Sequence, residues 1–137
     1  MLGIRLSDPV GSLVGAPVAT IRPTATLRQA ATALAADTVG LLVVVDPRGV
    51  HGVLSERDLV TAVVDNADLD DTRVRDYASS ELVQVEEDAS VLDAAAVMSR
   101  AQIRHLAIAR RGVVTGVVSV RDVLDVLLEE READVSA

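Results

Sequence analysis

The 137-residue sequence has no cysteine, phenylalanine or tryptophan, and its only aromatic residue is Tyr77. Without cysteine the chain can form no disulfide, carries no thiol nucleophile and offers no thiolate ligand to a metal. The hydrophobic core must be built from aliphatic side chains, because half of the residues are apolar and almost none is aromatic. A flat ligand ring would therefore be held by aliphatic contacts.

Lysine is also absent, and the 13 basic residues face 21 acidic ones, which gives a net charge of −8. This charge repels phosphate backbones, and no cluster of arginines and aromatics offsets it, so we expect no nucleic-acid binding. The apolar runs, such as residues 41–45, are far shorter than the about 20 residues of a membrane span. No sustained apolar segment follows the N-terminus, so we expect a cytoplasmic protein that does not enter membranes.

An internal repeat organises the chain. A shift of 64 positions places the sequence Gly-Val-Leu-Ser-Glu-Arg-Asp of residues 52–58 on Gly-Val-Val-Ser-Val-Arg-Asp of residues 116–122. The same shift aligns Ala25 with Ala89 without a gap. Self-similarity of this kind indicates one structural unit that is used twice.

Each half contains the sequence signals of two helices. A hydroxyl residue followed three positions later by Gln or Asp is typical of a capping box, which begins a helix. Apolar residues follow each box at helical spacing. The four predicted boxes are Thr26 with Gln29, Ser55 with Asp58, Ser90 with Asp93, and Ser119 with Asp122.

Runs rich in β-branched residues predict the strands. Each half is expected to have a short strand before its first helix and a hairpin between its helices, which gives the order β-α-β-β-α and an α/β (α+β) fold. The predicted strands cover residues 18–22, 41–45, 50–54, 82–86, 103–109 and 113–118. We expect one repeat at residues 10–66, a linker at 67–81 and a second repeat at 82–130, with a charged tail that frays after Glu129.

The repeated Gly-x-x-Ser-x-Arg-Asp motif lies where a strand runs directly into a helix. A helix N-terminus favours anions, the Ser hydroxyl can donate to a ribose or phosphate oxygen, and the Asp can accept from ribose hydroxyls. The glycine is expected to let a ligand approach the strand. Two interpretations remain open from the residues alone: Ser55 with Asp58 and Ser119 with Asp122 bind a ligand, or they are only helix caps.

The tandem motifs, each ending a β-α-β-β-α unit, resemble the cystathionine-β-synthase (CBS) repeat, and two of them resemble the paired CBS (Bateman) module in a stand-alone bacterial form. The resemblance covers about residues 10–130 and includes Ile-Arg-His-Leu at residues 103–106. It departs at Ala107-Ile108, where the family often has Pro-Val. It implies two repeats packed sheet to sheet with pseudo-twofold symmetry.

The resemblance further implies a site for AMP, ADP or ATP, with S-adenosylmethionine or NAD as alternative ligands. The motif residues would contact ribose and phosphate, Arg104 and His105 would face the phosphates, and backbone of the short strands would edge the adenine. The expected binding residues are Thr20, Ile21, Ser55, Arg57, Asp58, Val83, Gln84, Arg104, His105, Ser119, Arg121 and Asp122.

The function that follows is a regulatory nucleotide sensor that acts on a partner protein and needs no resident cofactor. The alternative is a structural or dimerisation pair without a physiological ligand. The exposed aliphatic residues expected on the second helix of each half predict a homodimer. We expect no metal, because His51 and His105 are the only histidines and lack metal-ligand spacing. We also expect no catalysis, and residues 11–15 are not a phosphate loop, because no Gly-Lys-Ser/Thr follows them.

The two sites are expected to differ in charge. Arg104 and His105 open a strand of the second half, whereas the equivalent positions of the first half are Gly40 and Leu41. Glu56 follows the serine in the first half, where the second half has a valine. A carboxylate repels a phosphate, so the second site should bind phosphate-bearing ligands more tightly.

Overall fold

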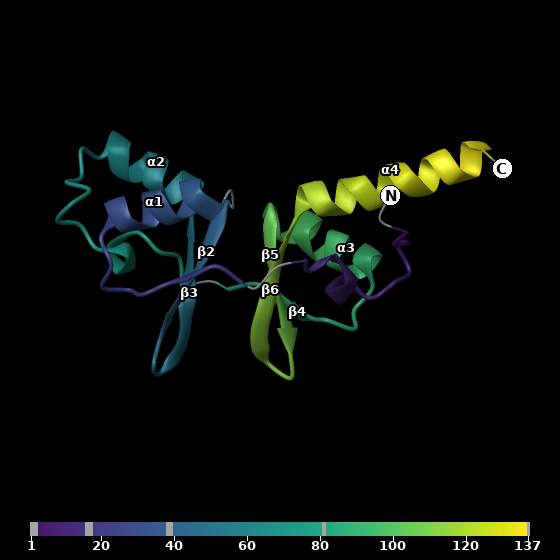
Figure 1. Ribbon diagram of the computed structural model, residues 1–137, viewed down its shortest axis with the longest axis horizontal. Coiled ribbons are helices and arrows are strands. Elements are labelled where there is room, and N and C mark those ends of the chain that lie inside the picture. The colour runs from purple at the N-terminus through teal and green to yellow at the C-terminus, as the bar shows by residue number, and fades with distance from the viewer. Residues whose placement is uncertain (1–2, 16–17, 38–39, 81, 137) are drawn as a thin grey trace. The chain divides into compact units, whose positions relative to one another are not determined.

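The computed structural model describes residues 3–15, 18–37, 40–80 and 82–136 (Figure 1). The chain folds into two compact units. One unit is Val18–Leu82, and the other combines Val83–Ala137 with Met1–Pro17. Each unit contains a three-stranded sheet and two α-helices, which confirms the predicted α/β fold of two β-α-β-β-α repeats.

The unit Val18–Leu82 has one parallel and one antiparallel strand pair. Its sheet order is β1-β2-β3, with β1 parallel to β2 and β3 antiparallel to β2. A 3-10 turn, η2, follows the second helix. The elements are β1 Thr20–Ile21, α1 Leu27–Asp37, β2 Leu41–Asp46, β3 Gly49–Ser55, α2 Glu56–Val64 and η2 Val74–Asp76.

The second unit repeats this topology with the order β4-β5-β6. Both antiparallel pairs carry a register irregularity, between Val44 and Val45 in one and between Ile108 and Ala109 in the other, again 64 positions apart. The repeat therefore extends to local backbone detail. The elements are η1 Val10–Leu13, β4 Gln84–Glu86, α3 Val91–Ala101, β5 His105–Arg110, β6 Val113–Ser119 and α4 Val120–Ser136.

The first helix of each unit begins at its predicted cap. The N–H of Gln29 donates to Thr26 Oγ1 at 3.1 Å, and the N–H of Thr26 donates to Gln29 Oε1 at 2.9 Å. In the other unit the N–H of Asp93 donates to Ser90 Oγ at 3.0 Å. These bonds satisfy backbone donors that have no partner within the helix, which is why the helices start at these residues.

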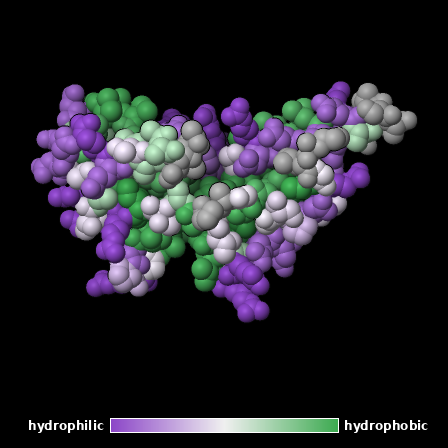
Figure 2. Space-filling model, viewed as in Figure 1, coloured by the Kyte–Doolittle hydropathy of each residue, from purple (hydrophilic) through white to green (hydrophobic). Residues whose placement is uncertain are grey.

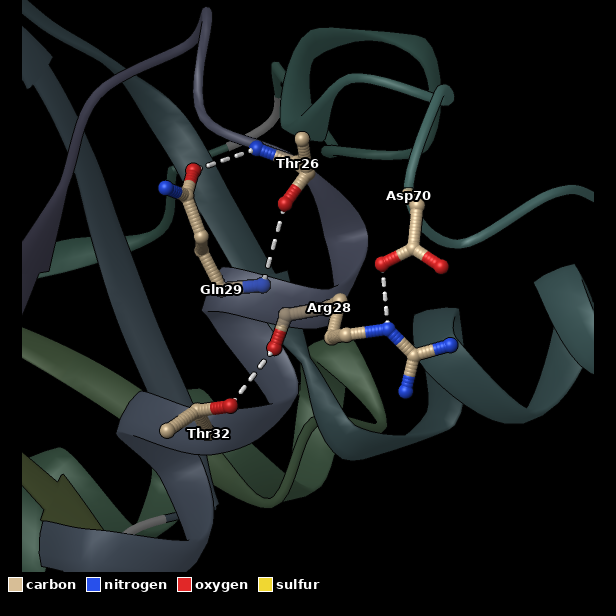
Figure 3. A pocket seen from close by; sticks show the side chains of 5 residues that line it. All are labelled: Thr26, Arg28, Gln29, Thr32 and Asp70. Carbon is tan, nitrogen blue, oxygen red and sulfur yellow. Dashed lines mark hydrogen bonds and ion pairs between the residues drawn. The ribbon is translucent and has the colours of Figure 1, made fainter.

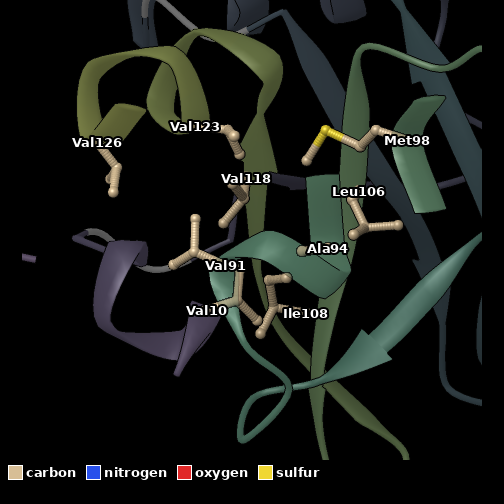
Figure 4. Close-up of a cluster of buried hydrophobic side chains, with 9 residues drawn as sticks. All are labelled: Val10, Val91, Ala94, Met98, Leu106, Ile108, Val118, Val123 and Val126. Atoms are coloured by element: carbon tan, nitrogen blue, oxygen red, sulfur yellow. The ribbon is translucent and has the colours of Figure 1, made fainter. Parts of the chain in front are cut away.

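The buried side chains of the two cores are aliphatic apart from one methionine, as predicted, and Figure 4 shows the core of the second unit. Each core gathers residues from both helices, the hairpin strands and a 3-10 turn. Eight buried positions are related by the 64-residue shift or its reverse. They are Leu27, Ala30, Leu34, Leu42, Val44, Leu54, Ala62 and Val74 in one unit, and Val91, Ala94, Met98, Leu106, Ile108, Val118, Val126 and Val10 in the other.

The structure differs from the sequence predictions at the end of one helix and in the lengths of two strands. Helix α4 continues to Ser136, so the prediction of a frayed tail after Glu129 was wrong. Residues 130–133 are good helix formers. Glu130 Oε1 also accepts the N–H of Leu6 at 2.9 Å, which ties this turn to the rest of the unit. The short strands β1 and β4 are two and three residues long, shorter than the predicted five. None of the described helices is long and apolar enough to cross a membrane.

Candidate functional site

In the first unit, the predicted binding residues lie on the sheet and at its junction with α2. Ser55 is the last residue of β3 and lies opposite Leu41, the first residue of β2. Helix α2 begins at the next residue. Thr20 and Ile21 form β1, on the other side of β2. The structure thus brings the short strand and the motif of this repeat to the same three-stranded sheet.

The second unit has the equivalent arrangement. Ser119 ends β6 opposite His105, the first residue of β5. Gln84 in β4 lies level with Ala107, whose N–H donates to Val83 O at 3.1 Å. Arg104 was predicted to open this strand, but it precedes the strand and its carbonyl accepts the N–H of Val120 at 2.8 Å. This bond joins the start of β5 to the start of α4.

The serine and aspartate of each motif form a complete capping box. Asp58 Oδ2 accepts from the N–H of Ser55 at 2.8 Å and from its hydroxyl at 3.0 Å, and the N–H of Asp58 donates to Ser55 Oγ at 3.2 Å. The corresponding distances for Ser119 and Asp122 are 2.9, 3.0 and 3.3 Å. The cap interpretation is therefore confirmed for both motifs, while the ligand role of the same atoms stays a prediction.

This geometry narrows what an anion could contact at the helix starts. The N–H of Glu56 donates to Gly40 O at 3.1 Å, and the N–H of Asp58 donates to Ser55 Oγ. Because these two N–H groups are already paired, they are not available to an anion at the start of α2. Of the neighbouring side chains, Arg57 is exposed and Asp58 is half-buried.

The motif glycines do not leave space for a ligand, so that prediction was wrong. A Cβ at Gly52, whose φ is +151°, would lie 1.9 Å from Ser79 O. A Cβ at Gly116 would lie 2.4 Å from Val14 Cγ1. Glycine is required because another segment of the same unit crosses the strand there. Sequence reasoning did not identify Val14 and Ser79.

The two junctions share their hydrogen bonds but differ in charge. Gly40 and Arg104 accept the equivalent helix N–H groups, and Leu41 and His105 hold the equivalent strand positions. Glu56, which is exposed, begins α2. The predicted difference in charge therefore occurs between two junctions whose backbone hydrogen bonds and strand pairing are equivalent.

An open pocket of about 450 Å³ lies elsewhere on the first unit, beside the start of α1 (Figure 3). Arg28 pairs with Asp70 across it, and the hydrogen bond to Asp70 raises the pKa of the Arg28 side chain. Thr26 and Gln29 form the helix cap there, and Thr32 donates to the carbonyl of Arg28 at 2.9 Å. Its polar side chains partner one another or the backbone, and none of the predicted binding residues lines it.

His51 pairs with a carboxylate on the neighbouring strand. Its Nε2 lies 2.6 Å from Asp46 Oδ2. Burial alone would raise the pKa of Asp46, but the N–H of Arg48 and the side chain of His51 outweigh it and lower that pKa. His51 is therefore a surface side chain that is paired with a carboxylate. Among the described residues, no three His, Cys, Asp or Glu side chains group into a metal-binding cluster.

Comparison with known proteins matches this chain to the family described as CBS domain, at residues 10–65 and at residues 74–129. Two relatives align with this chain over most of their own length. The chain is 33% identical, over 90% of its own length and 76% of the relative's, to an uncharacterized 17.7 kDa protein of Acidianus ambivalens. It is 31% identical, over 77% of this chain and 75% of the relative, to the CBS domain-containing protein YhcV of Bacillus subtilis.

Solved structures with nucleotides are also similar. A CBS domain protein from Pyrobaculum aerophilum complexed with AMP is 34% identical, with a TM-score of 0.80 over 88% of this chain and 96% of that one. The cytosolic domain of the Mg²⁺ channel MgtE in complex with ATP is 29% identical, with a TM-score of 0.71 over 88% of this chain and 49% of that one.

Proposed function

The chain belongs to the CBS domain family as a tandem pair of its repeats, and from this we propose that it is a regulatory module that binds an adenosine nucleotide. The observation that carries the proposal is the AMP complex of the Pyrobaculum aerophilum protein, which aligns with most of this chain. The ATP complex of the MgtE cytosolic domain supports the same ligand class.

The proposed contacts follow from the equivalent junctions. The half-buried carboxylates of Asp58 and Asp122 would accept from ribose hydroxyls, with Ser55 and Ser119 redirecting their hydroxyls to the ligand. The exposed Arg57 and Arg121 lie within the same motifs. A ligand hydroxyl that donates to one of these aspartate carboxylates must compete with the existing cap bond from the serine. This competition favours ligands whose hydroxyl groups are strong donors.

Recognition of the base and phosphates is proposed at neighbouring positions. Backbone groups of Thr20 and Ile21, or of Val83 and Gln84, would lie along the edge of the adenine ring. Arg104 and His105 would face phosphates of the second site, where the positive charge of Arg104 complements the ligand.

We propose that the module acts by binding rather than by catalysis. A nucleotide with different affinities for two conformations would shift their populations and so change a surface read by a separately encoded partner. The ligand class proposed is an intracellular metabolite, which supports a cytoplasmic location. Ligand binding by this mechanism needs no nucleophile, general base or metal.

A homodimer would supply part of that surface. Hydrophobic side chains are exposed on α2, where Figure 2 shows a hydrophobic patch, and also on α4. Such patches usually meet a partner in solution. The exposed residues are Val60, Val63 and Val64 on α2, and Leu124, Leu127 and Leu128 on α4.

Thermal unfolding with AMP, ADP, ATP, S-adenosylmethionine and NAD tests the proposed function. At a ligand concentration 100 times Kd, binding adds about 2.7 kcal/mol to the unfolding free energy. For a chain of this size we expect the Tm to rise by about 9 °C. The control is the double variant Asp58→Asn/Asp122→Asn, in which an amide oxygen can still accept the cap bonds but the charge is lost.

The outcomes separate the alternatives. A folded protein whose Tm responds to none of these ligands would indicate a structural or dimerisation pair. A response to S-adenosylmethionine or NAD, but not to AMP, ADP or ATP, would keep the sensor and change its ligand. Release of phosphate on incubation with ATP, absent from the control variant, would indicate an enzyme.

A further inference from the structure

Two segments dock in equivalent ways on the two units. We call residues 5–15 and 69–79 the lead segments, because each precedes the β-α-β-β-α core of one repeat in the sequence. Lead segment 69–79 belongs to the unit Val18–Leu82, so it docks on the repeat before it. Lead segment 5–15 belongs to the unit that contains the second repeat. Each core is thus completed by the lead segment of the other repeat.

The docking contacts are the same in both units. The N–H of Val10 donates to Ala89 O at 2.7 Å, and the N–H of Val74 donates to Ala25 O at 2.8 Å. Val10 and Val74 have no exposed surface and belong to the two cores. Figure 4 shows Val10 projecting from the N-terminal segment toward Val91. The lead segments are therefore integral parts of the units and not loose connections.

Lead segment 5–15 contacts both elements whose junction carries Ser119. On β6, the Val14 side chain fills the space beside Gly116. On α4, Glu130 Oε1 accepts the N–H of Leu6 at 2.9 Å. The segment consequently holds the strand and the helix on either side of the predicted site.

The other unit repeats this pattern with different chemistry. Ser79 and Val53 of β3 exchange two backbone hydrogen bonds of 2.9 and 3.0 Å beside Gly52. The hydroxyl of Tyr77 donates to Asp65 Oδ2 at 2.9 Å, and Asp65 is the C-cap of α2. Contact with both the strand and the helix of the motif is therefore a property of both lead segments.

We propose that Val14 is a positioning residue for the nucleotide site at Ser119 and Asp122, an inference that rests on the proposed function. Gly116 lies three residues before Ser119 on β6, which pairs with β5 along its length. Val118, between them, is buried in the same core as Val10. A displacement of β6 at Gly116 is therefore passed on to Ser119 and, through their mutual hydrogen bonds, to Asp122. Nucleotide binding by the second repeat then depends on a residue that precedes the first.

A double-mutant cycle tests this inference. The Cβ of Gly116→Ala would lie 2.4 and 2.9 Å from the two methyl carbons of Val14, whereas its backbone φ suits any residue. Val14→Ala removes both methyl groups and leaves its own Cβ 3.2 Å from the new one. The two substitutions together therefore relieve most of the overlap, and the remaining contact between the two Cβ atoms needs a shift of only a few tenths of an ångström.

The readout is the Kd for AMP by calorimetry, with the Tm of the ligand-free protein measured in parallel. We expect Gly116→Ala to raise the Kd about tenfold and Val14→Ala about threefold. The double variant should return to within about twofold of the unchanged chain. Val113→Ala, an exposed position of the same strand, is the matched control and should leave the Kd unchanged.

The possible results are distinguishable. A Kd that stays constant in Gly116→Ala and Val14→Ala while the Tm falls would overturn the inference, because Val14 would then be structural only. A double variant that binds as weakly as Gly116→Ala would also overturn it. If Gly116→Ala does not fold, the inference is tested by the Kd values of Val14→Ala and of the double variant. An unchanged Kd in Val14→Ala would then overturn it. Absence of any nucleotide binding by the unchanged chain would instead overturn the proposed function.

Discussion

Oδ2 of Asp122 accepts two hydrogen bonds from Ser119, one from its N–H at 2.9 Å and one from its hydroxyl at 3.0 Å. The same carboxylate is proposed to receive the ribose hydroxyls of a nucleotide. One pair of residues thus begins a helix and would also bind the ligand, so its contributions to stability and to affinity have to be measured separately.

Ser119→Ala is expected to lower both quantities. Loss of the cap should reduce the unfolding free energy by about 1 kcal/mol. Loss of the hydroxyl should also weaken AMP binding. Ser90→Ala is the matched control, because Ser90 caps α3 and is not among the proposed binding residues. Chemical denaturation should give similar losses for the two variants, and calorimetry should give a weaker affinity for Ser119→Ala alone. Equal affinities would leave Ser119 as a cap only.

The second prediction concerns the unequal sites. Asp122→Ala and Arg104→Ala should each weaken AMP or ATP binding about tenfold or more, because a charge-assisted Arg contact contributes about 1.5 to 3 kcal/mol. Asp58→Ala should have a smaller effect. Calorimetry on the three variants measures the order. The reverse order, or two equal sites, would contradict the asymmetry and indicate that Arg57 or Arg121 supplies the missing charge.

A reciprocal exchange gives the sharper control. Glu56→Val removes the carboxylate from the start of α2 and should strengthen ATP binding at the first site. The matching Val120→Glu adds one at the start of α4 and should weaken the second. Both positions are exposed, so neither substitution disturbs a core.

Much of the fold could be predicted because the two halves repeat local signals. Each of the four predicted hydroxyl caps begins a helix, and Gly49 adopts the positive φ of +128° that its turn requires. Capping and turn chemistry depend on a few neighbouring residues, so a sequence displays them directly. The prediction for the end of α4 was wrong because it left out the bond from the N–H of Leu6 to Glu130, a contact over 124 positions that adds to the local helix propensity.

Only part of the candidate site could be predicted from the sequence. The pairing of Ser55 with Asp58 follows from their spacing, but the occupant of the space at Gly52 does not. A glycine in a strand indicates a close approach without saying whether a ligand or another segment makes it. The 64-residue shift also aligns Val10 with Val74, so the repeat extends into the segments before each core, but the alignment does not show where those segments pack.

The third prediction is that the protein is a homodimer that depends on α2 and α4. Val63 is 60% exposed and Leu127 is 47% exposed, so a charged side chain at either position costs the monomer little. Val63→Glu and Leu127→Glu should shift the mass measured by light scattering from dimer toward monomer. Leu92→Glu on α3 is the control, since Leu92 is 57% exposed on a different helix. A monomeric unchanged chain at micromolar concentration would contradict the prediction.

The last prediction uses the single aromatic residue as a spectroscopic probe. The hydrogen bond to Asp65, followed by burial, raises the pKa of Tyr77 above its ordinary value of 10.0. Because the folded pKa is the higher one, this contact stabilises the fold fully below pH 10 and is lost as the pH rises through the folded pKa. With no other aromatic residue, tyrosinate absorbance reports Tyr77 alone. Its midpoint should exceed 10 in the folded chain and move back toward 10 in Asp65→Asn, whereas Asp68→Asn, a nearby exposed control, should leave it in place. An unchanged midpoint in Asp65→Asn would show that lead segment 69–79 is not held to α2 through this bond.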